Sequence, residues 1–336
     1  MNTKSTSVAV VILNWNKAEL TLSCIKNILR LLYENFTIYL VDNGSTDGSA
    51  ELFLRNELIT KSNKITFIAN SQNLGYAEGN NVAIRQILLK NESIDYIWLV
   101  NNDAIVESDT LSILVKQANS DQRIGLASPI LYRNKDKNVI ECAGVKIDIK
   151  KARHYSTIDL ETSKCWQKEN PQQVGVMGTA MLLRRSMIDK IGLLNSDLFA
   201  YMEDIEYSIR AIKSGYLCIT VHQASVYHLE RPVFKPTQET KVPYIEYYNT
   251  RNEIVVYFWH SPFLSALKNA YWVTRKRVIK INSLRKSTTN TDVISALLSG
   301  LWDGYRFRLG KFKSSDKAPM LFKYLVFGFG RFLTTK

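Results

Sequence analysis

Four short polar segments of this chain combine carboxylate and amide side chains, which are the groups that bind divalent cations and nucleotides. They are Asn14-Trp15-Asn16, Asp42-Asn43, Asn70 and Asn101-Asn102-Asp103, and each follows a run of apolar residues. A carboxylate such as that of Asp103 is a ligand for Mg²⁺ or Mn²⁺, which in turn binds substrate phosphates. The sequence Asn-Asn-Asp is also a common turn, so by itself it leaves a metal site and a plain turn equally open.

The apolar runs before these segments predict strands of a sheet that is covered on both faces. The runs are Val8–Leu13, Phe36–Val41, Ile65–Ala69 and Tyr96–Val100, and helical spacing between them predicts helices at Glu19–Leu32 and Asn81–Leu89. Strands that alternate with helices form a mainly parallel sheet. Ligands of such α/β sheets bind at the carboxyl ends of the strands, so the polar segments are expected to meet there.

The chain has no glycine-rich phosphate loop after its first predicted strand. That turn reads Asn14-Trp15-Asn16-Lys17, which lacks the Gly-x-Gly-x-x-Gly pattern of dinucleotide-binding folds, and no Gly-Lys-Ser/Thr loop is present. A nucleotide bound by this sheet therefore needs another anchor for its phosphates, and a divalent metal on Asp103 is such an anchor.

Two further candidates for chemistry lie beyond these strands. Glu203-Asp204 opens a predicted helix, Glu203–Ile212, where acidic residues also stabilise the helix dipole; the functional alternative is a general base that takes a proton from a hydroxyl. His228 follows a predicted strand, Leu217–Val226. A lone histidine is more often structural or solvent-facing, although it is also a metal ligand.

The charge is unevenly distributed and indicates two regions. The net charge is +13, of which residues 1–234 carry +1 and residues 235–336 carry +12. Prolines at 232, 236 and 243 mark the boundary. We therefore predict a catalytic domain over 1–234 and a helical, basic, aromatic-rich region over 235–336, with helices at Ile245–Trp259, Phe263–Ile281 and Val293–Phe307.

The remaining composition favours a folded protein of a reducing compartment. The four cysteines form no Cys-x-x-Cys pair, the first seven residues are polar rather than signal-like, and no apolar run is long enough to predict a transmembrane helix. We expect a cytoplasmic protein.

In their order along the chain, these motifs resemble those of the family 2 glycosyltransferases, which are inverting enzymes with a GT-A fold. The resemblance covers about Val8 to Asn252. It rests on Val10–Asn16, Val41–Ser49 (VDNGSTDGS), Asn73–Asn81, Leu99–Asp103, Gly178–Met181, Gly192 and Glu203-Asp204. The turn Leu99–Asp103 and the pattern Tyr247-Tyr248-x-x-Arg251-Asn252 are similar to those of a subgroup with rhamnosyltransferases and O-antigen transferases.

The resemblance implies a role for each site residue. Asp204 would be the catalytic base, Asp103 would hold Mg²⁺ or Mn²⁺ at the diphosphate, and His228 would complete the metal or diphosphate site. Asp42 would contact the base or ribose of the donor. The other residues implied for the nucleotide-sugar site are Asn14, Asn16, Asn43, Ser45, Asn73, Gly75, Asn81, Asn102 and Glu203.

The resemblance also implies a substrate class. The donor would be a nucleoside-diphosphate sugar, with dTDP-rhamnose the first expectation and a UDP-hexose (glucose or galactose) the alternative. The acceptor would be a lipid-linked oligosaccharide in the assembly of a bacterial surface polysaccharide. The Gln-x-x-Arg-Trp motif of processive synthases is absent, which favours an enzyme that adds one or a few sugars.

The basic last third has two open interpretations: a solvated helical appendage, or a peripheral contact with the inner face of the cell membrane. Aromatic residues alternate with Lys and Arg in Tyr271–Arg277 and Tyr305–Arg308, a mixture that suits an interfacial helix on anionic lipid. Rival functions are a nucleic-acid binder, which the near-neutral sheet region disfavours, and a catalytically inactive nucleotide-sugar-binding protein. The sequence does not indicate the oligomeric state.

Overall fold

The computed structural model describes residues 6–90, 93–133, 139–229, 243–285, 291–313 and 317–334. The chain divides into two compact units. The first comprises Met1–Ile147, His154–Ser196 and Glu203–Pro232, and the second comprises Asp148–Arg153, Asp197–Met202 and Val233–Lys336. The domain boundary predicted after Phe234 falls within 230–242, outside the described residues.

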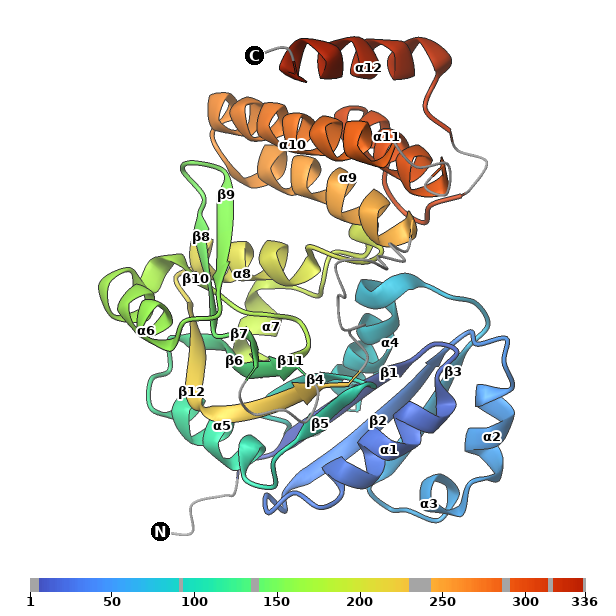
Figure 1. Cartoon of the computed structure of the whole chain (residues 1–336). Helices are drawn as coiled ribbons and strands as arrows, with labels where there is room; N and C mark the ends of the chain where they lie inside the picture. The colour runs from blue at the N-terminus through green and yellow to red at the C-terminus, as the bar shows by residue number, and fades with distance from the viewer. Residues whose placement is uncertain are drawn as a thin grey trace. The chain divides into compact units, whose positions relative to one another are not determined.

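A nine-stranded mixed sheet forms the centre of the first unit (Figure 1). Its strands are β1 (Val8–Asn14), β2 (Phe36–Asn43), β3 (Ile65–Asn70), β4 (Tyr96–Asn101), β5 (Ala104–Val106), β6 (Ile124–Arg133), β7 (Ile140–Cys142), β11 (Ala180–Arg184) and β12 (Leu217–His228). The order is β3-β2-β1-β4-β11-β6-β12-β5, with β7 paired to β6. A small second sheet has the order β10-β8-β9, from β8 (Gly144–Asp148), β9 (Arg153–Thr157) and β10 (Val174–Gly175).

The half of the large sheet that carries the polar strand ends is parallel, as predicted. The strands β3, β2, β1 and β4 all run in one direction. Beyond β4 the sheet is mixed, because β11 pairs antiparallel with both β4 and β6 while β12 runs parallel to β6. The predicted strands and the observed β1–β4 agree to within two residues at each end.

Helices cover both faces of the sheet, which explains the continuous apolar runs. One face packs on α4 (Gly75–Leu89), α7 (Arg185–Ile191) and α8 (Glu203–Lys213) through a cluster that includes Val11, Val41, Leu99, Ile84 and Tyr207. The other face packs on α1 (Ala18–Ile28) and α5 (Thr110–Asn119). The remaining elements are α2 (Ser49–Arg55), α3 (Glu57–Thr60), α6 (Leu160–Glu169), η1 (Pro171–Gln173) and η2 (Ser196–Leu198).

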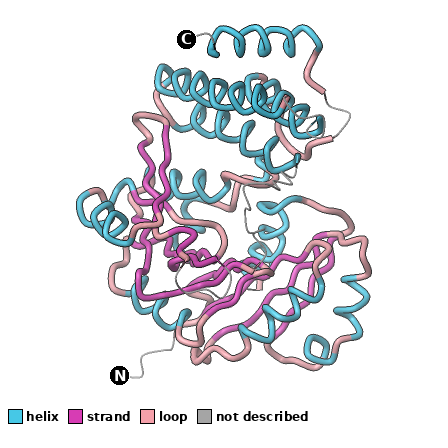
Figure 2. The backbone as a smooth tube through the Cα atoms, viewed as in Figure 1, coloured by secondary structure: helices cyan, strands magenta, loops and turns pink. Residues whose placement is uncertain are grey.

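The described residues after 242 form regular structure only as helices (Figure 2). These are α9 (Pro243–His260), α10 (Phe263–Leu284), α11 (Thr291–Tyr305) and α12 (Met320–Thr334), and the first three match the predicted helices closely. Their packing buries Val278, Ile281 and Leu297 in one cluster and Ile254 and Leu301 in another. Within the described residues no helix is both long enough and apolar enough to cross a bilayer.

Candidate functional site

The register of the parallel strands aligns the polar segments at one edge of the sheet. Asn14 pairs with Asp42 across β1 and β2, and Asn43 pairs with Asn70 across β2 and β3. Leu13 pairs with Asn101 across β1 and β4, so the Asn101–Asp103 turn begins beside the end of β1. The edge predicted from the sequence is therefore continuous over four neighbouring strands.

A buried hydrogen-bond network fixes the carboxylate of Asp42. The amide of Asn14 donates to Asp42 Oδ1 (2.8 Å) and to Ser45 Oγ (3.1 Å), and Ser45 Oγ donates to the same Oδ1 (2.6 Å). Thr21 donates to Asn14 Oδ1 (2.7 Å), and Asn102 donates to Thr21 (2.9 Å). Asn14 has no exposed surface, so its contribution here is to orient Asp42 and the neighbouring turns.

Asn16 and Ser45 join the turn after β1 to the turn after β2. The main-chain N–H of Asn16 donates to Ser45 Oγ (2.9 Å), and Asn16 Oδ1 accepts from the N–H of Thr46 (2.8 Å). Gly44, which directly follows β2, has φ +67°, and a Cβ there would lie 2.3 Å from the carbonyl carbon of Gln72. A side chain at Gly44 is excluded both by that contact and by the left-handed backbone.

Asn43 and Asn73 organise the start of α4. Asn43 Nδ2 donates to Asn73 Oδ1 (3.2 Å) and to the carbonyl of Gly75 (3.0 Å), and its Oδ1 accepts from Asn70 (3.1 Å). Asn73 Oδ1 also accepts from the N–H of Gly75 (2.8 Å). These amides satisfy one another and determine where the helix begins.

Asn81, which the resemblance assigned to the donor pocket, bonds elsewhere. Its amide donates to the carbonyl of Leu194 (2.9 Å) and accepts from the N–H of Leu194 (3.1 Å). Both are buried bonds between the side chain of Asn81 and the main chain of Leu194, so in this structure Asn81 ties α4 to the loop after α7. The polar atoms of Asn81 are used in that tie and in a bond to Glu78.

Asp103, His228 and Glu141 form a charged row at the end of β4 and β12. His228 Nε2 lies 3.1 Å from Asp103 Oδ1, and His228 Nδ1 lies 3.3 Å from Glu141 Oε2. Burial opposes charge on this imidazole, but hydrogen bonds and attraction from Asp103 and Glu141 outweigh it and raise the pKa of His228 to about 9. Glu141 was missed by the sequence analysis because no motif surrounds it.

The pair Asp103 and His228 brings together a carboxylate and an imidazole, two groups that bind divalent metals. With the imidazole protonated, the 3.1 Å contact between Nε2 and Oδ1 is an ion pair, and a metal at this nitrogen would replace the proton. Glu141 faces the other ring nitrogen, where a carboxylate fixes the orientation of a metal-bound histidine. Among the described residues no group of three or more His, Cys, Asp or Glu is placed to hold an ion, so the diphosphate and water would supply the other ligands.

The carboxylate of Asp204 lies at the start of α8 and accepts two main-chain hydrogen bonds. Oδ2 accepts from the N–H of Gly178 (2.9 Å), and Oδ1 accepts from the N–H of Ile205 (2.8 Å). Burial nevertheless raises the pKa of Asp204. The neighbouring Glu203 is also buried, and burial together with the charge of Asp204 raises its pKa to about 8. Such raised values are typical of groups that exchange protons.

One short segment connects Asp204 to the end of β4. The N–H of Asn101 donates to the carbonyl of Thr179 (2.9 Å), while Gly178 beside it donates to Asp204. Tyr76 donates to the carbonyl of Gly178 (2.9 Å). The pKa of Tyr76 is raised well above its usual value by burial and then by the charges of Glu203, Asp204 and Asp103.

Tyr76 was not singled out by the sequence analysis, although the segment Asn73–Asn81 contains it. Its position beside the carboxylates depends on the packing of α4 against the segment between β10 and β11, and no local pattern encodes that packing. A tyrosine within a recognised motif was the only available signal.

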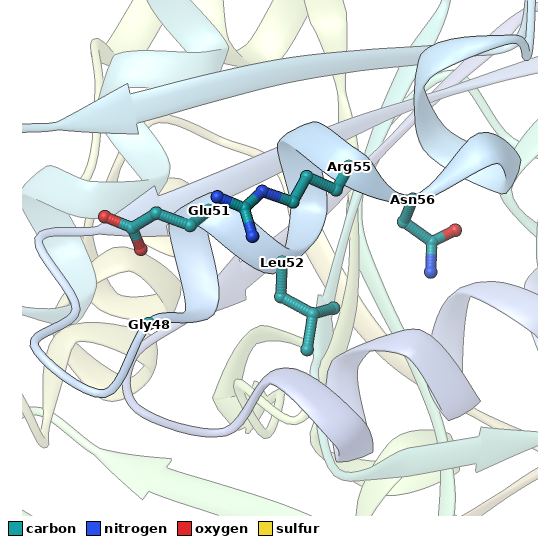
Figure 3. Close-up of a pocket in the computed structure, with 5 residues that line it drawn as sticks. All are labelled: Gly48, Glu51, Leu52, Arg55 and Asn56. Carbon is teal, nitrogen blue, oxygen red and sulfur yellow. The ribbon is translucent and has the colours of Figure 1, made fainter.

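A surface hollow of about 440 Å³ lies along α2 and is lined by Gly48, Glu51, Leu52, Arg55 and Asn56 (Figure 3). Glu51 and Arg55 are one helical turn apart, and none of the five residues belongs to the polar edge described above. The position of this surface hollow therefore does not identify the candidate active site.

Comparison with known proteins identifies the class. The model of glycosyl transferase family 2 matches residues 9–192, which is more than half of the chain, and the chain belongs to this family. It is 28% identical over 132 residues to glycosyltransferase GlyG of Streptococcus pneumoniae serotype 4, a match that covers 39% of this chain and 42% of GlyG. It is 29% identical over 111 residues to poly-beta-1,6-N-acetyl-D-glucosamine synthase of Staphylococcus aureus, covering 33% of this chain and 25% of the synthase.

Solved structures support the fold. The mannosyltransferase PcManGT from Pyrobaculum calidifontis, in complex with GDP-Man and Mn²⁺, superimposes with a TM-score of 0.54 over 90% of this chain and 88% of its own, at 15% identity. The predicted α/β GT-A fold with a helical C-terminal region is thereby confirmed. The chain spans less than half the length of the two curated relatives.

Proposed function

We propose that this chain transfers a sugar from a nucleoside-diphosphate sugar to a hydroxyl of a saccharide acceptor, with inversion at the anomeric carbon. One observation carries the proposal. The segment Gly178-Thr179 binds Asp204 through one N–H and the end of β4 through one carbonyl. A candidate base and the turn with the candidate metal ligand Asp103 are thus tied to the same two residues.

In this mechanism Asp204 accepts the proton of the acceptor hydroxyl. The oxygen forms a bond to the anomeric carbon while the bond to the diphosphate oxygen breaks, and that electron pair leaves with the nucleoside diphosphate. Burial raises the pKa of Asp204, which makes its carboxylate a stronger base than an exposed aspartate. Because the reaction is one displacement, the configuration at the sugar inverts.

Asp103 and His228 would hold Mg²⁺ or Mn²⁺, and the ion would neutralise charge on the departing diphosphate. Asp42 would bind the base or ribose, with its carboxylate oriented by Asn14 and Ser45. Support for the ion comes from the direct contact between Asp103 and His228 beyond the end of β4, which places two metal-binding groups together, and from the Mn²⁺ bound in PcManGT.

For the donor we propose dTDP-rhamnose first and a UDP-hexose second, because the Leu99–Asp103 turn resembles that of rhamnosyltransferases. The test is a panel of nucleotide sugars, including dTDP-rhamnose, UDP-glucose, UDP-galactose, UDP-GlcNAc and GDP-mannose. Release of nucleoside diphosphate is measured with Mn²⁺ and with EDTA. Metal-dependent release from one donor supports the proposal, and no release from any donor in either condition contradicts it.

For the acceptor we propose a lipid-linked oligosaccharide at the inner face of the cell membrane, in the assembly of a bacterial surface polysaccharide. The support is an exposed apolar surface on two C-terminal helices, which we call the apolar helix faces. They consist of Phe263, Leu264, Leu267 and Tyr271 on α10 and Met320, Leu321, Tyr324 and Leu325 on α12. Residues 235–336 also carry a net charge of +12, which favours anionic lipid.

Sedimentation with vesicles tests this surface. Leu264→Glu combined with Leu321→Glu is expected to reduce binding to vesicles that contain anionic phosphatidylglycerol. Leu89→Glu is the matched control, since Leu89 on α4 is 83% exposed and belongs to the first unit. Equal sedimentation of all three proteins would contradict membrane contact and favour a solvated helical appendage.

The rival classes predict different results. A nucleic-acid binder would shift labelled RNA or DNA with a strong salt dependence and would release no nucleoside diphosphate. A nucleotide-sugar-binding protein without activity would bind UDP or dTDP with Mn²⁺ but would leave the donor intact. The buried carboxylate of Glu203 and the raised pKa of Asp204 favour the enzyme.

A further inference from the structure

The pattern Tyr247-Tyr248-x-x-Arg251-Asn252 has no part in the proposed reaction, although its last two residues are fully buried on α9. Buried polar side chains require hydrogen-bond partners. In this case most of the partners are main-chain carbonyl groups of one short segment, 198–201, that leads to α8. Both α9 and this segment belong to the second unit.

The carboxamide of Asn252 binds three carbonyl oxygens of that segment. Nδ2 lies 3.0 Å from the oxygen of Leu198, 2.9 Å from that of Ala200 and 2.7 Å from that of Tyr201. Two amide hydrogens are thus shared among three acceptors. Because Asn252 has no exposed surface, water does not compete for these bonds.

Arg251 fixes which way the Asn252 amide faces and adds a second hold on the segment. Its Nε donates to Asn252 Oδ1 (2.7 Å), which leaves Nδ2 directed at the carbonyl oxygens. Its Nη2 donates to the carbonyl of Leu198 (2.7 Å), and its Nη1 donates to the carbonyl of Gly310 (2.7 Å). The guanidinium also lies over the ring of Tyr248, 5.0 Å from its centroid.

Segment 198–202 has an unusual backbone conformation that these hydrogen bonds stabilise. Phe199, Tyr201 and Met202 have φ of +64°, +66° and +70°, in the left-handed region that residues other than glycine rarely adopt. Several such residues in one segment persist only where their surroundings determine the conformation. Phe199 stacks on Tyr248 with ring centroids 5.3 Å apart, and the peptide bond after Met202 leads directly into α8.

We propose that Asn252 and Arg251 are positioning residues for the catalytic base. By holding segment 198–202 in its left-handed conformation, they set the backbone conformation of the residues that directly precede α8, whose second residue is Asp204. The inference rests on the proposed function, because it assumes that Asp204 is the base. It assigns to the tyrosine-arginine-asparagine pattern of α9 a role in turnover that is separate from donor binding.

Asn252→Asp tests the proposal because it keeps the shape of the side chain and places an acceptor against three carbonyl oxygens. Asn269→Asp is the matched control: Asn269 is a buried asparagine of α10 whose Nδ2 donates to the carbonyl of Ala152 (2.9 Å), also within the second unit. Arg251→Lys is a second variant, which retains the charge and Asn252 but loses the planar fork.

Three measurements are made on each full-length protein. They are kcat with the donor that the wild type turns over, the Kd of the matching nucleoside diphosphate (UDP or dTDP) with Mn²⁺ by calorimetry, and hydrogen exchange of the peptide over 203–213. Circular dichroism confirms folding. Since a displacement of about 1 Å costs roughly 100-fold in rate, we expect Asn252→Asp to lower kcat by about that factor, with Kd unchanged and exchange over 203–213 accelerated.

Arg251→Lys is expected to show a smaller loss of kcat and a smaller acceleration of exchange over 203–213, with Kd unchanged. If Asn252→Asp does not fold, Arg251→Lys tests the proposal in its place. The proposal is overturned if these variants keep kcat within about twofold of wild type, well short of that 100-fold, if Asn269→Asp loses as much kcat, or if exchange over 203–213 does not change. A wild type without turnover would contradict the proposed function instead, and the exchange measurement would still decide whether the two residues hold the start of α8.

Discussion

The side chains of Tyr76 and Asp204 are joined through Gly178. Tyr76 donates to the carbonyl of Gly178, and the N–H of Gly178 donates to Asp204 Oδ2, both at 2.9 Å. A Cβ at Gly178 would lie 3.4 Å from the Cβ of Asp204, which is van der Waals contact, so the two residues are direct neighbours. The orientation of one carboxylate oxygen therefore depends on a main-chain group that a tyrosine of α4 holds in place.

Tyr76→Phe is expected to lower kcat about fivefold, which corresponds to the loss of one buried hydrogen bond of roughly 1 kcal/mol that orients the base. The KM for the donor should change little. Tyr96→Phe provides the control. Tyr96 is the first residue of β4, at the end of the strand opposite to the candidate site, and it donates to Asn119 Oδ1 (2.8 Å). The measurement is steady-state kinetics of both variants. An equal loss of kcat in Tyr76→Phe and Tyr96→Phe would mean that Tyr76 has only a general structural role.

Asp204→Asn is expected to reduce kcat by a factor of about 10² to 10⁴, the usual contribution of a general base. The amide retains the shape of the side chain, so the nucleoside diphosphate should bind with its wild-type Kd in calorimetry with Mn²⁺. Undiminished turnover in this variant would reject Asp204 as the base. Loss of nucleotide binding would show that Asp204 acts in the donor site instead.

The pH dependence of kcat follows from the raised pKa of Asp204, which burial causes. A base must be deprotonated, and a raised pKa leaves a smaller fraction deprotonated as the pH falls. We expect kcat to decrease with falling pH at values above the usual 3.8 of an aspartate. The measurement is kcat at saturating donor from about pH 4 to 9. A rate that stays constant down to pH 4 would contradict both the base and its burial.

Glu203 links stability to pH in the opposite sense to an ion-paired carboxylate. Its pKa rises from 4.5 to about 8 through burial and the charge of Asp204, so the folded protein binds a proton that the unfolded chain releases. This contribution to stability is present below about pH 4.5 and is lost as the pH rises through about 8. Glu203→Gln should therefore unfold at a higher denaturant concentration than wild type at pH 8 but not at pH 4. The same difference in denaturation midpoint between variant and wild type at both pH values would exclude this linkage.

The sequence predicted the polar edge because parallel strands place their ends in register. The pairs Asn14 with Asp42 and Asn43 with Asn70 require only that four apolar runs form neighbouring parallel strands. It also located the start of α8, where acidic residues favour a helix N-terminus. These features are local or depend on a regular sheet.

The sequence did not predict the elements between residues 104 and 173 or the contacts that complete the site. The strands β5 and β7 have three residues each, too few for a periodic pattern. Glu141 reaches His228, and Asn81 reaches Leu194, through packing between segments far apart in the chain. The resemblance of Asn73–Asn81 to a nucleotide-binding segment made Asn81 a candidate for the donor pocket, but it could not predict the buried bonds between Asn81 and Leu194.

Asp103 and His228 are expected to determine the affinity for Mn²⁺. Asp103→Asn removes the carboxylate charge from the proposed ion, and His228→Gln removes its nitrogen ligand; each should weaken Mn²⁺ binding in the presence of nucleoside diphosphate. Glu141→Gln leaves both ligands in place but loosens the imidazole, and such outer carboxylates typically contribute about 10-fold to 100-fold in metal affinity. Electron paramagnetic resonance of free Mn²⁺ measures each Kd, and Glu107→Gln, which alters the carboxylate bonded to Tyr227 (2.8 Å), is the control. Wild-type Mn²⁺ affinity in both Asp103→Asn and His228→Gln would place the ion elsewhere.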